Sequence, residues 1–190
     1  MEKIIILVLF VIFLAAAIMP RVIQNKRKIE TVGCIGINRK LFFLGKISLF
    51  TSFILVLVQL FVVNLSLFEK KNIFLWLCVV LIGTGVMFFT LAIIRLGTFS
   101  LRVGLAQENT ALRTTGIYRF SRNPMLFGLY LIALGSAVYV QNPINWILVM
   151  IALIVHHKII LAEEIFLLKQ FGSAWIDYSG QVRRYIGRKW

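Results

Sequence analysis

The stretch that decides the fold is residues 123–157, which reads NPMLFGLYLIALGSAVYVQNPINWILVMIALIVHH and contains no Asp, Glu, Lys or Arg. A helix needs about 20 apolar residues to cross a hydrocarbon core of roughly 30 Å, so this run is too long for one crossing. It is interrupted at residues 141–143, where Pro143 removes a helix donor and clashes with the preceding turn. The stretch therefore predicts a hairpin of two membrane helices, at about residues 125–140 and 144–166.

Three more charge-free runs precede this hairpin, at residues 4–20, 47–68 and 72–94. Each is about long enough to cross a bilayer as a helix. With 60% hydrophobic and 15% charged residues, the chain has more apolar side chains than the core of a soluble domain this small can bury. Gly83 and Gly85 in the third run are expected to let another helix approach closely.

The sequence thus predicts a single, all-helical integral membrane domain with five transmembrane helices. Residues 1–95 form a scaffold of three spans, and residues 96–190 form the functional half with the last two. The first run follows Lys3, as a signal peptide would, but Pro20 and Arg21 do not form a cleavage site of small residues. We therefore expect the first span to be retained.

The net charge of +14 is distributed unevenly along the chain. Five alternating spans place three basic segments on one side of the membrane, whereas the opposite side has only Lys3, Lys70 and Lys71. The positive-inside rule then predicts an external N-terminus, with the basic segments beside the anionic cytoplasmic leaflet. Nucleic-acid binding is the weaker explanation of the charge. The basic segments comprise Arg21, Lys26, Arg27, Lys28, Arg39, Lys40 and Lys46, then Arg95, Arg102, Arg113, Arg119 and Arg122, then Lys169, Arg183, Arg184, Arg188 and Lys189.

Polar residues precede the hairpin. Arg122 and Asn123 come directly before Pro124, which suits the first turn of a helix because its missing donor is not needed there. The free amides of that turn, together with Arg122, can hold a carboxylate or a phosphate. The simpler interpretation, which this motif alone favours, is that Arg119 and Arg122 anchor the helix at the lipid headgroups.

A second polar group lies near the end of the hairpin. His156 and Glu163 are two turns apart on one helical face, as are His157 and Glu164. Carboxylates at a helix C-terminus oppose the helix dipole and so need a partner, and a sulfonium or ammonium would stabilise their charge. Paired histidines without a matching His or Cys elsewhere predict no metal site, and Cys34 and Cys78 suggest neither a disulfide nor a metal.

Two further segments flank this half. Residues 96–115 contain turn signals at Gly97, Gly104 and residues 107–110 and are expected to form a short irregular hairpin. The tail is amphipathic from Gln170 onward and could lie on the membrane surface or fold back as the lid of a pocket.

Together these residues resemble the family of membrane-embedded methyltransferases that includes isoprenylcysteine carboxyl methyltransferase and the phospholipid N-methyltransferases. The resemblance runs from about Leu96 to Ile186. The matching residues are Leu96 to Ser100, Leu112, Thr115, Gly116, Tyr118, Arg122 to Met125, Gly128, Glu163, Glu164, Phe171, Gly172, Trp175, Tyr178, Val182 and Arg184.

The resemblance implies that S-adenosylmethionine binds at the cytoplasmic end of the hairpin beneath the C-terminal segment, while a lipophilic acceptor enters from the bilayer. It further implies that Glu163 lies near the reacting centre, that Arg122 orients the cofactor or an acidic acceptor, and that Glu164 faces the cationic part of the cofactor. The implied cofactor-binding residues are Leu112, Gly116, Tyr118, Asn123, Pro124, Glu164, Trp175 and Tyr178.

The chemical class of the methyl acceptor stays open: it can be an amine, a carboxylate, a phenol or a thiol. Carboxyl methyltransferases of prenylated cysteine have His where this chain has Asn123 and Arg where it has Ile159, and Lys158 points to another face. Residues 123–125 are more similar to the phospholipid N-methyltransferases, although Leu126 stands where tyrosine is usual.

Two other classes remain. Membrane sterol reductases, which bind NADPH, have a C-terminal segment similar to Gly172 to Tyr178. Their chains are longer, however, and they usually have Asp in place of Glu163 and Glu164. A non-catalytic membrane protein of the same fold is the third possibility, and paired glutamates beside a pocket argue mildly against it.

Overall fold

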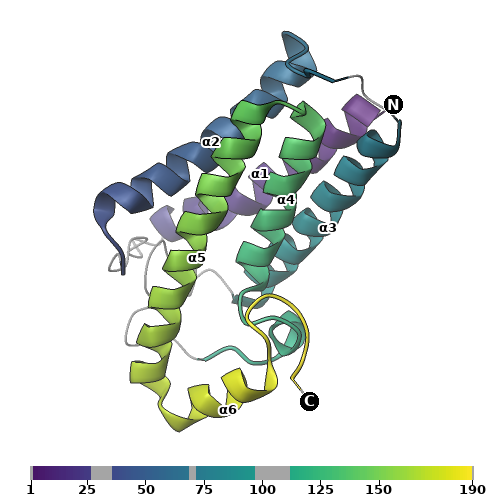
Figure 1. Cartoon of the computed structure of the whole chain (residues 1–190). Coiled ribbons are helices and arrows are strands. Elements are labelled where there is room, and N and C mark those ends of the chain that lie inside the picture. Colours follow the sequence, from purple (N-terminus) through teal and green to yellow (C-terminus); the bar gives the residue numbers. More distant parts are fainter. Residues whose placement is uncertain (1, 27–35, 69–71, 97–111, 190) are drawn as a thin grey trace.

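A computed structural model describes residues 2–26, 36–68, 72–96 and 112–189 of the chain (Figure 1). These residues contain no β-strand, and the tail has one isolated antiparallel bridge between Val182 and Arg188. The elements are α1 (Glu2–Lys26), α2 (Arg39–Phe61), α3 (Asn72–Leu96), the short 3₁₀ helix η1 (Gly116–Arg119), α4 (Pro124–Val140), α5 (Pro143–Phe171) and α6 (Ser173–Gln181).

Four helices, α1, α2, α3 and α5, are long and apolar enough to span a membrane. Large apolar side chains cover their outer faces, where a soluble protein would expose polar ones. The prediction of an all-helical integral membrane protein is therefore confirmed. The fourth predicted span, α4, has 17 residues and so a length of about 25 Å, less than the roughly 30 Å of a hydrocarbon core. The count of five spans stays a prediction.

Two predicted boundaries are wrong. The basic residues assigned to the loop after the first span lie partly within helices, since α1 continues through Pro20 to Lys26 and α2 begins at Arg39. Long basic side chains can extend from a helix end to the interface, so a charge need not end a membrane helix. In addition, α2 ends at Phe61 rather than near Phe68.

The break within the long apolar run is where the sequence predicts it. α4 ends at Val140, Gln141 adopts a left-handed conformation with φ of 50°, and α5 starts at Pro143. The Asn142 side chain accepts a hydrogen bond from the Ile144 amide at 3.0 Å and caps α5. Helices α4 and α5 therefore form an antiparallel hairpin.

The closest helix crossing joins α3 to α4. A Cβ atom on Gly85 would lie 2.6 Å from the Gly128 carbonyl oxygen, and one on Gly128 would lie 2.5 Å from the Gly85 oxygen. Only glycine fits at both positions, because the two backbones touch. The expectation of close approach is confirmed for Gly85 but not for Gly83, where an added Cβ would have one ordinary contact, with Leu9 at 3.9 Å.

The candidate site lies at one end of this bundle. The C-terminal end of α3, the N-terminal end of α4 and the C-terminal end of α5 all point toward it, and α6 and the tail occupy the same end (Figure 1). At the opposite end the segment after α2 is bonded to the α4–α5 turn, since the Leu67 amide donates to the Gln141 oxygen at 3.3 Å.

Candidate active site

The entry into α4 is shaped by Pro124, which occupies the first turn as predicted. Asn123, directly before it, does not cap the helix with its side chain. Instead its backbone amide and its side-chain Nδ2 both donate to the Arg184 carbonyl oxygen, at 3.2 and 3.3 Å. The residue before α4 is therefore used to bind the tail.

The tail folds back over the start of α4. The Arg122 amide donates to the Arg183 oxygen at 3.1 Å, and the Gly187 amide donates to the Phe120 oxygen at 2.7 Å. Tyr178 on α6 adds a buried hydrogen bond from its hydroxyl to the Tyr118 oxygen at 2.7 Å. Of the two tail positions that the sequence left open, the structure has the one in which the tail returns to the helix ends.

Glu164 on α5 is bound by two arginines. Arg184 donates from Nε to Oε1 at 3.0 Å and from Nη2 to Oε2 at 2.7 Å, and Arg122 Nη2 lies 3.3 Å from Oε1. The side chains of Arg122 and Glu164 are only 9% and 13% exposed. The hydrogen bond to Glu164 raises the pKa of Arg184, whereas burial lowers the pKa of Arg122, partly offset by Glu164. The partner that a carboxylate near a helix C-terminus needs is thus supplied by the chain itself.

Glu163, the adjacent carboxylate, faces a different space. It lines a cavity of about 130 Å³ between the end of α5, the start of α4 and α6. Its carboxylate has no hydrogen bond or ion pair with any residue that the structure describes. Successive residues of a helix point about 100° apart, so one carboxylate can join the arginines while its neighbour faces the cavity.

Aromatic side chains of α6 form another wall of this cavity. Trp175 and Tyr178 pack edge to face with ring centroids 5.8 Å apart, and both are buried. The Arg122 guanidinium lies over the Trp175 ring at 5.5 Å, and its buried Nε has no hydrogen-bond partner among the residues that the structure describes. Burial raises the pKa of both Tyr118 and Tyr178, so these phenols stay protonated at neutral pH.

Most of the predicted site residues meet at this cavity. Those that line it are Leu112, Tyr118, Arg122, Asn123, Pro124, Glu163, Trp175 and Tyr178. The other two predicted residues do not line the cavity. Glu164 is paired with arginine side chains, and Gly116 begins η1 with a φ of +64°. A Cβ on Gly116 would lie 2.9 Å from Nε of the flexible Arg95 side chain, which can move, so it is the left-handed backbone conformation that favours glycine there.

Sequence reasoning missed other residues of the site. Six more line the cavity: Leu96, Met125 and Phe171, which were recognised only as parts of the family motifs and without a role, and Arg113, Leu126 and Leu167. Arg184 was recognised only as part of the tail motif, without a role. The signal that could have found it is the unmatched charge of Glu164, since a partly buried carboxylate requires a cation.

Tyr185, also missed, lies between the two helices of the hairpin. Its hydroxyl hydrogen-bonds with Nδ1 of His157 on α5, and its ring lies 5.7 Å from that of Tyr130 on α4. Arg184 and Tyr185 therefore bind Glu164 and His157, which share one face of α5 as predicted. His156 lies elsewhere, buried, with its Nδ1 bonded to the Ala152 oxygen at 2.7 Å.

Some predictions lie outside the described residues: the first motif segment after Leu96, the turn signals at residues 97–110, and Cys34. Cys78 is buried in α3, and its Sγ bonds to the Leu75 oxygen at 2.9 Å. Within the described ranges no three His, Cys, Asp or Glu side chains gather as a metal site would require.

One comparison with known proteins gives a family match. A sequence model described as phospholipid methyltransferase matches residues 73–174, from the start of α3 to the start of α6. The match covers more than half of the chain, and it includes both the arginine-bound Glu164 and the cavity-facing Glu163. A search of curated proteins returned no match.

Proposed function

Because the chain belongs to the phospholipid methyltransferase family, we propose that it transfers a methyl group from S-adenosylmethionine to a lipophilic acceptor that enters from the bilayer. The observation that supports this most directly is the position of Glu163. Its unpaired carboxylate faces a cavity beside an arginine and an aromatic wall. Unpaired carboxylates in such a setting are costly unless a ligand uses them.

The groups at the cavity suit the chemistry of S-adenosylmethionine. When bound, this cofactor supplies an electrophilic methyl group on a sulfonium, and it also has an ammonium, a carboxylate and an adenine ring. Glu163 offers a negative charge for a cationic part, and the unpartnered Arg122 Nε offers a donor for the carboxylate. Trp175 and Tyr178 offer apolar ring surface. Met125 and Leu126, in the first turn of α4, bring backbone amides that lack helical partners to the same cavity.

The residues of this chain would act mainly by position and by exclusion of water. Methyl transfer depends on in-line approach, and α6 borders the cavity with Trp175 and Tyr178 while the tail holds α6 and the start of α4 together. For an amine acceptor, Glu163 is the acidic group among the described cavity residues that can accept the released proton. Arg122 would orient the cofactor or an acidic acceptor, as the resemblance implies.

We further propose five membrane spans, with α4 as the fourth, and a cytoplasmic site. The basic residues at the site end of the helices support this orientation through the positive-inside rule. The proposed acceptor is an amine, a carboxylate, a phenol or a thiol on a hydrophobic molecule. For Glu164, a role at the cation of the cofactor would require exchange of its two arginine partners.

A reductase that binds NADPH is the second candidate, on the basis of the arginines. Two of these, Arg122 and Arg184, already pair with Glu164, which leaves less positive charge for nucleotide phosphates. Calorimetric titration with S-adenosylhomocysteine and, in parallel, with NADPH separates the two proposals. Binding of NADPH alone would favour the reductase, and binding of neither would favour a non-catalytic protein.

The activity test uses methyl-labelled S-adenosylmethionine with vesicles of phosphatidylethanolamine and, separately, with a prenylated cysteine. We expect label in one of these acceptors, and we expect Glu163→Gln to lower turnover roughly 100-fold or more. Asp177→Asn is the matched control, because Asp177 is an exposed carboxylate on α6 that does not line the cavity. Unchanged turnover in Glu163→Gln would refute the role of Glu163.

A further inference from the structure

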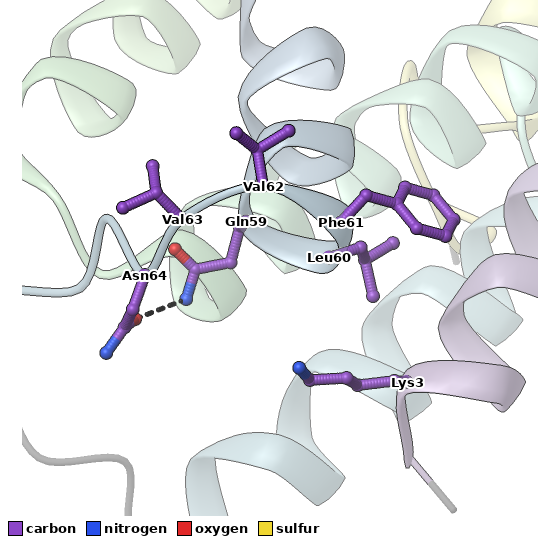
Figure 2. A pocket seen from close by; sticks show the side chains of 7 residues that line it. All are labelled: Lys3, Gln59, Leu60, Phe61, Val62, Val63 and Asn64. Carbon is purple, nitrogen blue, oxygen red and sulfur yellow. Dashed lines mark hydrogen bonds between the residues drawn. The ribbon is translucent and has the colours of Figure 1, made fainter.

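A second cavity lies at the opposite end of the helices from the candidate active site (Figure 2). It has a volume of about 390 Å³ and is bordered by the first turn of α1 and by residues 59–64 at the end of α2. Ligand pockets commonly measure about 300–1,000 Å³, so its size suits a small ligand or the head of a larger one.

The polar side chains of this cavity leave two donors free. Both polar atoms of the Gln59 side chain already have a partner, since its Nε2 donates to Asn64 Oδ1 at 2.9 Å and its Oε1 accepts from the Leu65 amide at 2.6 Å. Asn64 Oδ1 also accepts from the Ser66 amide at 3.2 Å, which fixes the orientation of the Asn64 amide. Among the described residues, neither Asn64 Nδ2 nor the Lys3 ammonium has a partner, and Figure 2 shows Lys3 across the cavity from Gln59 and Asn64.

The charge of the cavity is positive. Lys3 is its one ionic side chain among the described residues, and no carboxylate lines it. An ammonium and an unpartnered amide N–H at the border of one cavity favour an acceptor-rich anion such as a phosphate.

The rim of the cavity is apolar and exposed. Phe61, Val62 and Val63 are 66%, 78% and 52% exposed at the end of a membrane helix. A soluble anion would leave these side chains without a partner, whereas a lipid would cover them with acyl chains. The combination of free donors inside and an apolar rim outside indicates an amphiphilic ligand.

We propose that this cavity binds an anionic phospholipid, with the headgroup phosphate at Lys3 and Asn64 and the acyl chains along Phe61, Val62 and Val63. The bound lipid lies in the leaflet opposite the candidate active site. It is therefore distinct from a methyl acceptor at the cavity of Glu163, and the proposal does not depend on the methyltransferase activity.

The test is native mass spectrometry of the full chain in detergent, titrated with dioleoylphosphatidylglycerol. Wild-type protein should retain the lipid in a saturable manner. Lys3→Gln should weaken binding about fivefold, as expected for one basic charge at a membrane surface. Lys26→Gln, an exposed lysine at the other end of the same helix, should leave binding unchanged.

A second variant guards against indirect effects of the lost charge. Val62→Trp keeps all charges and adds volume at an exposed rim position, so it should reduce binding without loss of helical circular dichroism. Equal lipid retention by wild type, Lys3→Gln and Val62→Trp would overturn the proposal, because it would indicate general coating by lipid. Competition by inorganic phosphate at concentrations similar to those of the lipid would overturn it too, in favour of a soluble anion.

Discussion

Arg184 in the tail donates two hydrogen bonds to the carboxylate of Glu164 on α5, at 3.0 and 2.7 Å. The two side chains come from segments that are separated by α6, and their contact joins the tail to the last membrane helix. Two-point pairs of this kind are stronger and more directional than single hydrogen bonds between neutral groups. This pair therefore helps to hold the tail in place, together with the backbone hydrogen bonds to Arg183 and Arg184 and the buried side chain of Val182.

Replacement of Arg184 by Gln should loosen the tail. Loss of hydrogen bonds to a charged group costs about 1.5–3 kcal/mol, and Glu164 would keep Arg122 as its remaining partner. We expect a lower thermal midpoint and faster proteolytic cleavage after α6. The control is Arg183→Gln, since Arg183 is exposed and bonds only through its backbone. Equal cleavage rates in the two variants would contradict this assignment.

The two adjacent glutamates should respond differently to the same change. Glu164→Gln leaves the mostly buried Arg122 without its carboxylate and should lower the free energy of unfolding by about 3–5 kcal/mol. Glu163→Gln removes a charge that has no partner, so it should leave stability unchanged or increase it. Thermal unfolding in one detergent compares the two. A larger loss in Glu163→Gln would mean that the two side chains are interchanged.

The contact between Gly85 and Gly128 should tolerate no side chain. Gly85→Ala would place a methyl group against backbone at 2.6 Å, which should cost about 1–3 kcal/mol or more through separation of α3 and α4. Gly83→Ala, in the same helix, meets only an ordinary contact and should gain up to about 1 kcal/mol from helix propensity. The yield of monodisperse protein and the thermal midpoint should therefore both fall in Gly85→Ala and both rise in Gly83→Ala.

Two substitutions of Tyr185 should separate the contribution of its hydrogen bond from that of its ring contact. Tyr185→Phe removes the hydrogen bond to His157 and keeps the ring beside Tyr130, so we expect a loss of about 1 kcal/mol. Tyr185→Ala removes both contacts and should cost clearly more. The measurement is the unfolding free energy of each variant, with Ile186→Ala as the control at an exposed neighbouring position. Equal losses in Phe and Ala would show that the ring contact contributes nothing.

Local signals predicted the parts of the fold that depend on the backbone. Pro143 and the residues before it placed the hairpin turn, and Pro124 placed the start of α4. Proline acts through its own ring and missing donor, so its effect can be read without knowledge of distant residues. The start of α2 at Arg39 could not be read in this way, because a basic residue at a membrane boundary fits a loop and a helix end equally well.

The division of roles between Glu163 and Glu164 was also beyond sequence reasoning. Both residues lie in the same helical turn, and which of them meets a cation depends on where the tail returns. That return is set by backbone bonds such as the one from the Asn123 amide to Arg184. Contacts between distant segments of this kind leave no periodic trace in the sequence, whereas the need of a carboxylate for a partner did predict that one exists.

The meeting of Gly85 and Gly128 has a mechanical consequence for the cavity. With two backbones in direct touch, α3 and α4 can neither approach further nor slide without collision, so this side of the cavity is a stationary wall. The other side, made by the end of α5, α6 and the tail, is held by polar contacts that can break and form again and by an apolar cluster of Trp175, Tyr178 and Val182. We therefore expect any adjustment of the cavity to a ligand larger than its present 130 Å³ to come from this second side rather than from α3 and α4.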